Sequence, residues 1–256
     1  MERLVTLLRF SERFLRRPII RPLNTLDETL QKLEDAPTAT EDLALALLKR
    51  PDISAEVLEQ LSKNTTVMKC RKVKLALIRH PKTPRYVSLS VLRHSFTFDL
   101  MQVALTPTVH GDIKIAAEEA LIHRLETIST GERLSLARRA SGRVAGALLL
   151  DPEPRVMRAA LENARLTEAS IIQALMRPNA RAAFVQEVCH HAKWSLRREI
   201  RFTLLRNEKT PLASALEFAR TLPPAVVREI LQNSRLPLSV KRGLEKKLER
   251  KTRKSC

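Results

Sequence analysis

The densest group of residues that could bind a metal ion is Cys189, His190 and His191. Zinc sites in proteins use about three or four ligands. Neighbouring residues on a helix project about 100° apart, so at most two of these side chains can reach one ion. Glu119 and His123 stand four residues apart, which is the spacing of a side-chain pair on one helix face. The sequence therefore predicts no metal site, and we expect a buried cysteine beside surface histidines.

Other catalytic and cofactor chemistry lacks its usual motifs. None of the five glycines stands in a G-x-G or G-K-S/T context, so no phosphate-binding loop is expected. The sequence has no G-x-S-x-G nucleophile motif. Three widely spaced cysteines (Cys70, Cys189 and Cys256) do not form a disulfide framework, which favours a reducing, cytoplasmic location. We expect a protein without catalytic residues, cofactor or small-molecule substrate.

Charge is the strongest functional signal in the sequence. The chain contains 46 Lys and Arg against 28 Asp and Glu, which gives a formal net charge of +18. A field of this strength favours an anionic partner, such as nucleic acid, a ribonucleoprotein or an acidic protein. The charge is also uneven, because residues 60–98 contain no acid at all while residues 24–59 are rich in acids.

Seven of the basic residues share a spacing relative to leucines that recur along the chain. The leucines are Leu47, Leu77, Leu161, Leu204 and Leu231. Three residues before them stand Lys74, Arg158, Arg201 and Arg228, and six residues before them stand Arg71, Arg155 and Arg198. Equivalent positions in stacked repeats share a surface, so these residues predict a basic ridge that suits a row of phosphates.

Two further expectations concern this ridge. Trp194 lies one turn from Arg197 and Arg198, where its ring could stack on a nucleic-acid base. The alternative is that the arginines serve the turns of the fold. In that case Asp151 would pair with Arg155 or Arg158.

The elements that position these residues are predicted to be short helices. Leu, Ala, Arg and Glu dominate, glycine is scarce and aromatics make up 4%, which favours an all-α fold. The phrase LIRHPKTP at Leu77 returns as LLRNEKTP at Leu204, and looser copies recur elsewhere. Recurrence every 20–50 residues or so indicates a stacked repeat array. Prolines are expected at helix starts. We predict at least ten short helices in antiparallel pairs, with a longer helix within residues 105–147.

One stretch resembles a known class of repeat. Residues 148–175, LLLDPEPRVMRAALENARLTEASIIQAL, resemble the bacterial HEAT-like and variant leucine-rich repeat families, which alternate a DPxPxVRxAxA turn-helix with an NPxTPxxxL turn-helix. The matching residues are Asp151, Pro152, Val156, Arg158 and Ala160 in the first half and Asn163, Thr167 and Leu175 in the second. The resemblance implies a right-handed α-α superhelix that binds a partner along one face. DNA glycosylases built of HEAT-like repeats are similar in size and charge, and they are the one enzyme alternative.

The chain is predicted to have three parts. Residues 1–22 form a basic amphipathic helix that caps the first repeat, or that touches an anionic membrane peripherally through residues 1–17. Residues 23–248 form the α-helical repeat domain, and residues 249–256 form a basic tail. The expected function is a non-catalytic module that binds a polyanion through the ridge. The alternative is a protein–protein scaffold for an acidic partner.

Overall fold

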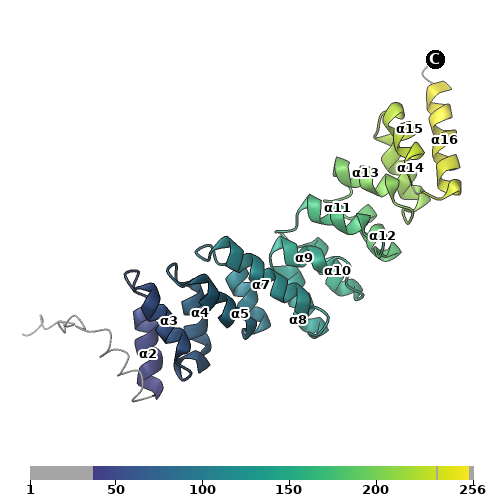
Figure 1. Cartoon of the computed structure of the whole chain (residues 1–256). Helices are drawn as coiled ribbons and strands as arrows, with labels where there is room; N and C mark the ends of the chain where they lie inside the picture. Colours follow the sequence, from purple (N-terminus) through teal and green to yellow (C-terminus); the bar gives the residue numbers. More distant parts are fainter. Residues whose placement is uncertain (1–36, 235, 254–256) are drawn as a thin grey trace, which may run out of the picture. The chain divides into compact units, whose positions relative to one another are not determined.

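The computed structural model describes residues 37–234 and 236–253 (Figure 1). These residues form helices and turns without any strand, so the predicted all-α class is confirmed. The expected cap or membrane helix at residues 1–22 lies outside the described residues. Residues 249–253, expected in a basic tail, continue the last helix instead.

The described residues form fifteen α-helices, more than the minimum of ten that was predicted. They are α2 (Pro37–Leu48), α3 (Ala55–Lys63), α4 (Arg71–Arg79), α5 (Arg85–Arg93), α6 (Thr97–Leu105), α7 (Gly111–Arg124), α8 (Thr130–Arg139), α9 (Gly142–Leu148), α10 (Pro154–Leu161), α11 (Glu168–Met176), α12 (Ala182–His190), α13 (Arg198–Arg206), α14 (Leu212–Arg220), α15 (Pro224–Gln232) and α16 (Leu238–Arg253). A short 3-10 helix, η1 (Val67–Lys69), precedes α4.

Several prolines mark helix starts, as the sequence predicted, whereas Pro51, Pro81, Pro107 and Pro178 lie in turns shortly after helix ends. Pro84, Pro211 and Pro223 occupy the N-cap positions of α5, α14 and α15. Pro154 opens α10, where the missing N–H would have no partner in the helix anyway. Most helices span seven to ten residues, and α7 is the longer helix expected within residues 105–147. Helices this short are unstable alone, so packing against neighbours must hold them.

The chain divides into two compact units, Met1–Leu77 and Ile78–Cys256, and the division falls within α4. In the first unit η1 contacts α2 and α3 over a core that includes Ala44, Leu58 and Leu61. Leu47 was expected in this core and is only half-buried. Leu48 is 7% exposed and takes the inward position, because the face of α2 that carries Ala44 and Leu48 is the one that packs.

The helices of the second unit form two rows. In the odd row, α5, α7, α9, α11, α13 and α15 each contact the next member. In the even row, α8 contacts α10, α10 contacts α12, and α14 contacts α16. Figure 1 shows α9, α11 and α13 along one side of the unit and α8, α10 and α12 along the other. Most helices of the second unit therefore pack against a helix two positions away along the chain.

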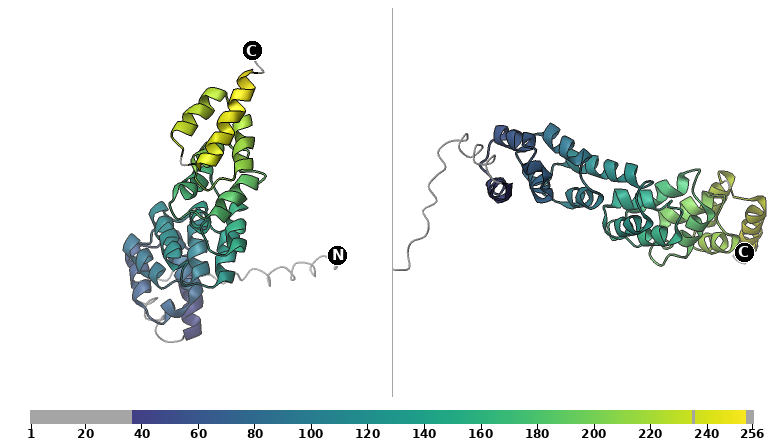
Figure 2. Two further views of the ribbon diagram at one scale, coloured as in Figure 1. Left: turned by 90° about the vertical axis from the view of Figure 1, so that its right-hand side faces the viewer. Right: turned by 90° about the horizontal axis from the view of Figure 1, so that it is seen from below.

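The hydrophobic core lies where the rows face each other. Consecutive helices such as α8 and α9, α9 and α10, and α13 and α14 contact across the rows. Leu161 of α10, Leu204 of α13 and Leu231 of α15 are all buried there, as predicted, and Leu77 is buried in α4. Figure 2 shows from two further directions that the helices of this unit follow one another in chain order.

Candidate functional site

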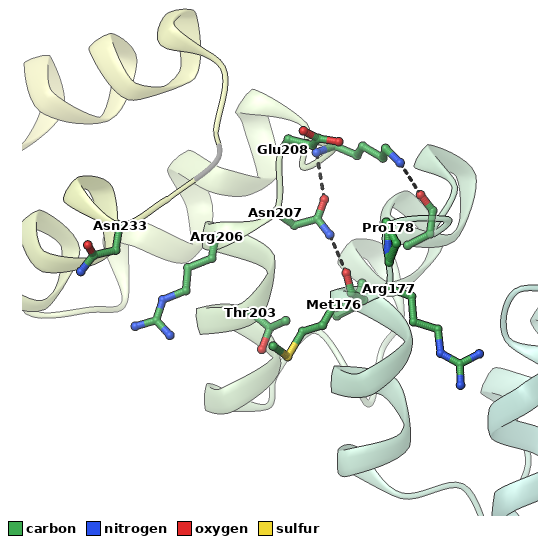
Figure 3. Close-up of a pocket in the computed structure, with 11 residues that line it drawn as sticks. Met176, Arg177, Pro178, Thr203, Arg206, Asn207, Glu208 and Asn233 are labelled. Atoms are coloured by element: carbon green, nitrogen blue, oxygen red, sulfur yellow. Dashed lines mark hydrogen bonds between the residues drawn. The ribbon is translucent and has the colours of Figure 1, made fainter.

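The turn after α13 is fastened to the end of α11 by Asn207 and Lys209 (Figure 3). The Asn207 Nδ2 donates a hydrogen bond to the Leu175 carbonyl over 2.9 Å, and its Oδ1 accepts one from the Lys209 backbone N–H over 2.9 Å. The Lys209 ammonium donates to the Ala180 carbonyl over 2.6 Å. The last carbonyl groups of a helix lack partners within the helix. The later turn supplies donors to carbonyls at the end of α11 and just beyond it.

The turn after α10 repeats this arrangement. Asn163 is 2% exposed, and its Nδ2 donates to the carbonyls of Ala137 and Ala140 at the end of α8, over 2.7 and 3.2 Å. The Asn163 Oδ1 accepts a hydrogen bond from the Arg165 backbone N–H, as Asn207 does from Lys209. The Arg165 guanidinium then donates to the Arg139 carbonyl over 3.3 Å. In both turns, the basic residue two positions after the asparagine therefore stabilises the fold by donating a hydrogen bond to a backbone carbonyl.

We use the word tether for a hydrogen bond between the ends of two helices that are two positions apart in the chain. The donor lies at the end of the later helix or just after it, and the acceptor carbonyl lies at or near the end of the earlier helix. Further tethers run from Trp194 to the Leu161 carbonyl, from Arg124 to the Arg93 and Ser95 carbonyls, and from His110 to the Pro81 carbonyl. Donor and acceptor lie 23 to 33 residues apart. In each tether the donor comes from the later part of the chain. The tethers explain part of the high Lys and Arg content without any external partner.

We expect Asn207→Ala to lower the free energy of unfolding by about 1–2 kcal/mol, because the Leu175 carbonyl and the Lys209 N–H both lose a partner. Asn233 provides the matched control, since it follows α15 as Asn207 follows α13 but is exposed and makes no side-chain hydrogen bond to another described residue. Asn233→Ala should change stability by less than about 0.5 kcal/mol. Urea unfolding followed by circular dichroism measures both, and equal effects would contradict a tether at Asn207.

The seven residues of the predicted ridge do not line one row of helices. Arg155 and Arg158 lie on α10 in the even row, whereas Arg198 and Arg201 lie on α13 and Arg228 lies on α15 in the odd row. Arg71 and Lys74 belong to the first unit. Within the second unit, the structure therefore places Arg155 and Arg158 together on one row and Arg198, Arg201 and Arg228 on the other, where α13 contacts α15.

Two of the ridge residues are engaged within the protein. Arg158 forms an ion pair with Glu187 of α12, with 2.6 Å between its Nη2 and the Glu187 Oε1. Arg201 is half-buried, and its guanidinium donates to the Ser195 carbonyl over 2.6 Å and to the Thr221 hydroxyl over 3.0 Å. Arg201 is therefore a structural residue, as the alternative interpretation of the ridge proposed, although its partners are not aspartates.

Arg155, Arg198 and Arg228 are exposed, and none forms an ion pair with an acid of the described residues. The Arg198 guanidinium lies 5.1 Å from the centre of the Phe202 ring, a cation–π contact that leaves its charge uncompensated. Arg198 and Arg228 are the exposed part of the predicted ridge that lies on two contacting helices, α13 and α15.

Trp194 does not offer a ring face to a nucleic-acid base. Its side chain is buried, at 3% exposure, and its indole N–H donates to the Leu161 carbonyl over 2.8 Å. The Lys193 ammonium covers the ring at 4.0 Å from its centre. The predicted stacking role is corrected by this burial, because the turn after α12 directs the indole inward to the end of α10.

Asp151 pairs with neither Arg155 nor Arg158. Its carboxylate lies 2.9 Å from the Nε of Arg133 on α8, and its side chain is 5% exposed against 17% for that of Arg133. The Asp151 Oδ1 also accepts a hydrogen bond from the Glu153 backbone N–H. The carboxylate of this turn is therefore paired between α8 and the turn before α10, within the even row.

The Cys189–His191 segment combines a buried cysteine, as expected, with an exposed His190 and a half-buried His191. Cys189 is buried, and burial raises the pKa of its thiol to about 11. His190 donates through its Nδ1 to the Gln186 carbonyl, and the His191 Nδ1 accepts from the Lys193 backbone N–H. Burial also lowers the pKa of His191. Among the described residues, no three His, Cys, Asp or Glu side chains come close enough to hold a metal ion.

A pocket of about 280 Å³ lies at the ends of α11 and α13 and reaches Asn233 after α15 (Figure 3). Its lining includes Arg177, Arg206 and Lys209, together with Glu208. Figure 3 shows the Arg177 and Arg206 side chains directed away from each other, and Lys209 is already bound in a tether. The cationic groups therefore do not converge on one point, and the pocket lacks the geometry of a preorganised anion or catalytic site.

The sequence interpretation missed an exposed aromatic group. Among the described residues, the exposed aromatic side chains are Tyr86, Phe96 and Phe98, at 59%, 67% and 36%. All three lie in the acid-free stretch that ends at residue 98. The sequence composition does not reveal this group, because the exposure of a phenylalanine depends on its position in the folded chain.

Comparisons of the chain with protein-family models, curated proteins and solved structures gave no match. The resemblance of residues 148–175 to HEAT-like and variant leucine-rich repeats therefore stays a prediction. None of the described helices combines the length and the apolar character needed to cross a lipid bilayer.

Proposed function

We propose that the protein is a non-catalytic α-helical repeat module that binds a polyanion, either nucleic acid or a ribonucleoprotein. The observation that carries the proposal is how the charges are distributed. Seven acids of the described residues form ion pairs within the fold, while cations such as Arg155, Arg198 and Arg228 are exposed and form no ion pair with a described acid. Ion pairs join Asp151 to Arg133, Glu118 and Glu119 to Arg143, Asp112 to Arg85, Glu187 to Arg158, Glu59 to Lys63 and Asp52 to Arg50.

The surface of α13 and α15 is the best-supported binding face. Arg198 lies near the start of α13 and Arg206 at its end, and Arg228 lies on the adjoining α15. All three side chains are exposed. A surface on which cations recur along adjoining helices suits a phosphate backbone, whose charges also recur along a line.

We infer further that the two rows belong to a right-handed superhelix of the HEAT-like or variant leucine-rich repeat kind. The tethers support this inference, because they recur along the second unit and join segments 23 to 33 residues apart. That interval matches one helix pair in a stacked array. We place the protein in the cytoplasm, since Cys70 and Cys189 are free thiols.

The alternative function is a scaffold for an acidic protein, which the same exposed cations would also attract. A DNA glycosylase of the HEAT-like type is the weaker alternative. Such enzymes hold an extruded base between aromatic side chains. The pocket at α11 and α13 is lined by no aromatic residue, and Trp194 is buried.

Charge reversal on α13 and α15 tests the proposed function. Arg198→Glu with Arg228→Glu should weaken binding of the protein to a fluorescent oligonucleotide. Each lost phosphate contact should also flatten the plot of log K against log salt, by about 0.7 on a single strand or 0.9 on a duplex. Fluorescence anisotropy over a series of salt concentrations gives both quantities.

The control changes the net charge equally on the even row. Arg220→Glu with Arg242→Glu alters two exposed arginines of α14 and α16. This pair should retain most of the affinity and the salt slope. An equal loss in both variants would mean bulk attraction without a binding face. Wild-type protein that binds neither a single strand nor a duplex would refute the polyanion proposal and favour the acidic-protein scaffold.

A further inference from the structure

The segment between α5 and α6 combines aromatic exposure with positive charge. Phe96 is 67% exposed at the N-cap of α6, and Phe98 follows two residues later at 36%. Arg93 and His94 are exposed immediately before them. The rest of the described aromatic residues, apart from Tyr86, are buried or half-buried. Among the described residues, two of the three exposed rings therefore lie in this short segment, in a chain where aromatics make up only 4% of the residues.

The backbone that carries these rings is held firmly. The Arg124 guanidinium, at the end of α7, donates to the Ser95 carbonyl over 2.6 Å and to the Arg93 carbonyl over 3.0 Å. Ser95 is 6% exposed, and its hydroxyl donates to the Val91 carbonyl over 2.9 Å. The rings thus project from a turn whose backbone is already ordered, which lowers the entropic cost of binding a ligand on them.

We propose that the turn Arg93–Phe98 is a stacking platform for the bases of single-stranded nucleic acid. Every base has an aromatic face, so a phenyl ring stacks on bases of any sequence. Arg93 and His94 are exposed and precede Phe96 closely in the chain, and they suit the phosphates that flank a stacked base. In a duplex the bases are already stacked and paired, so their faces are closed to Phe96. The inference rests on the proposed function and narrows its ligand to unpaired strands.

The surrounding charge distinguishes this turn from an ordinary hydrophobic contact. Residues 78–98 of the second unit contain Arg79, Lys82, Arg85 and Arg93 and no acid. Arg85 is paired with Asp112 across a distance of 2.7 Å, and Arg79 donates to Gln102, which leaves Arg93 and Lys82 as exposed cations of this stretch. Exposed rings among unopposed cations complement a ligand that is aromatic and anionic at once.

The test compares Phe96→Ala with Leu196→Ala. Leu196 is 68% exposed, so its loss removes a similar exposed apolar surface elsewhere on the same unit. The probe is a mixed-sequence single strand of about 16 nucleotides, the upper end of the site sizes of single-strand-binding modules. Phe96→Ala should weaken binding about fivefold or more, and Phe96→Trp should retain binding, because stacking needs only an aromatic face. Leu196→Ala should bind as the wild type does.

Two further probes separate stacking from charge. A strand of the same length that lacks bases should bind the wild type and Phe96→Ala equally, and so should a blunt duplex. If Phe96→Ala binds the normal strand as tightly as wild type while the salt slope persists, the platform is refuted and the polyanion proposal stands. If no oligonucleotide binds, both are refuted. If Phe96→Ala loses binding only to vesicles of phosphatidylserine and phosphatidylcholine, the turn is a membrane contact and the platform is again refuted.

Discussion

Trp194→Ala is expected to lower the free energy of unfolding by about 4 kcal/mol, the typical cost of deleting a buried aromatic side chain. The indole is 3% exposed and fills the space between the turn after α12 and the end of α10. Its removal leaves both a cavity and an unpaired Leu161 carbonyl. Urea unfolding followed by far-ultraviolet circular dichroism measures the change, since the variant lacks the chain's one tryptophan.

Trp194→Phe separates the two contributions. This variant loses the indole N–H but retains much of the aromatic volume, so it leaves a smaller cavity. Its free energy of unfolding should therefore fall by less than that of Trp194→Ala. The unpaired carbonyl alone should account for about 1–3 kcal/mol. A Trp194→Ala protein of unchanged stability that binds single strands more weakly would contradict the buried position and restore the stacking role predicted from the sequence.

Asp151→Ala is expected to destabilise the protein by about 3 kcal/mol, because it leaves the Arg133 guanidinium largely buried without its counter-charge. The two side chains are 5% and 17% exposed, and 2.9 Å separates the Asp151 Oδ2 from the Arg133 Nε. The Glu153 backbone N–H also loses its acceptor. The midpoint of thermal or urea unfolding measures the loss.

An exposed ion pair supplies the control for Asp151. Glu187→Ala removes the partner of Arg158, whose side chain is 61% exposed, and should cost less than about 1 kcal/mol. Replacing both members of the buried pair, with Arg133→Met and Asp151→Leu, should recover much of the stability lost by Asp151→Ala. If the double variant is less stable than Asp151→Ala, the ion pair itself stabilises the fold. The loss in Asp151→Ala would then not be explained by the unpaired Arg133 charge alone.

The helical content of the chain could be predicted because it depends on local properties. Pro84, Pro154 and Pro211 stand at helix starts for a reason that acts within one turn of backbone. Burial of Leu161 and Leu204 followed from the apolar spacing around them. Leu47 was placed wrongly by one residue, because adjacent leucines at 47 and 48 leave the inward face undetermined until the partner helix is known.

The ridge could not be placed from the sequence because rows alternate from helix to helix. The interval from Leu161 to Leu204 contains an extra helix, so α10 and α13 fall in different rows although their leucines are both buried. Helices of both rows bury leucines on their inner faces. The spacing of leucines in the sequence therefore does not reveal in which row a helix lies. Arg158 and Arg201 share a register with respect to leucine and still lie on different surfaces.

Turn residues were the least predictable. Asn163 and Asn207 are each followed two residues later by a basic residue, Arg165 and Lys209. Their side chains act on carbonyls 23 to 32 residues earlier, which only the packing of alternate helices brings within reach. Trp194 was assigned outward for the same reason, since its hydrogen-bond acceptor lies 33 residues away.

The direction of the tethers has a consequence for how the chain is made. In each case the acceptor carbonyl precedes its donor in the chain. The carbonyl groups at the end of a tethered helix therefore gain these hydrogen bonds only after two more helices have left the ribosome. Each new turn closes a site that the growing chain already presents. The tethered helices of the second unit can therefore be completed in the order of translation.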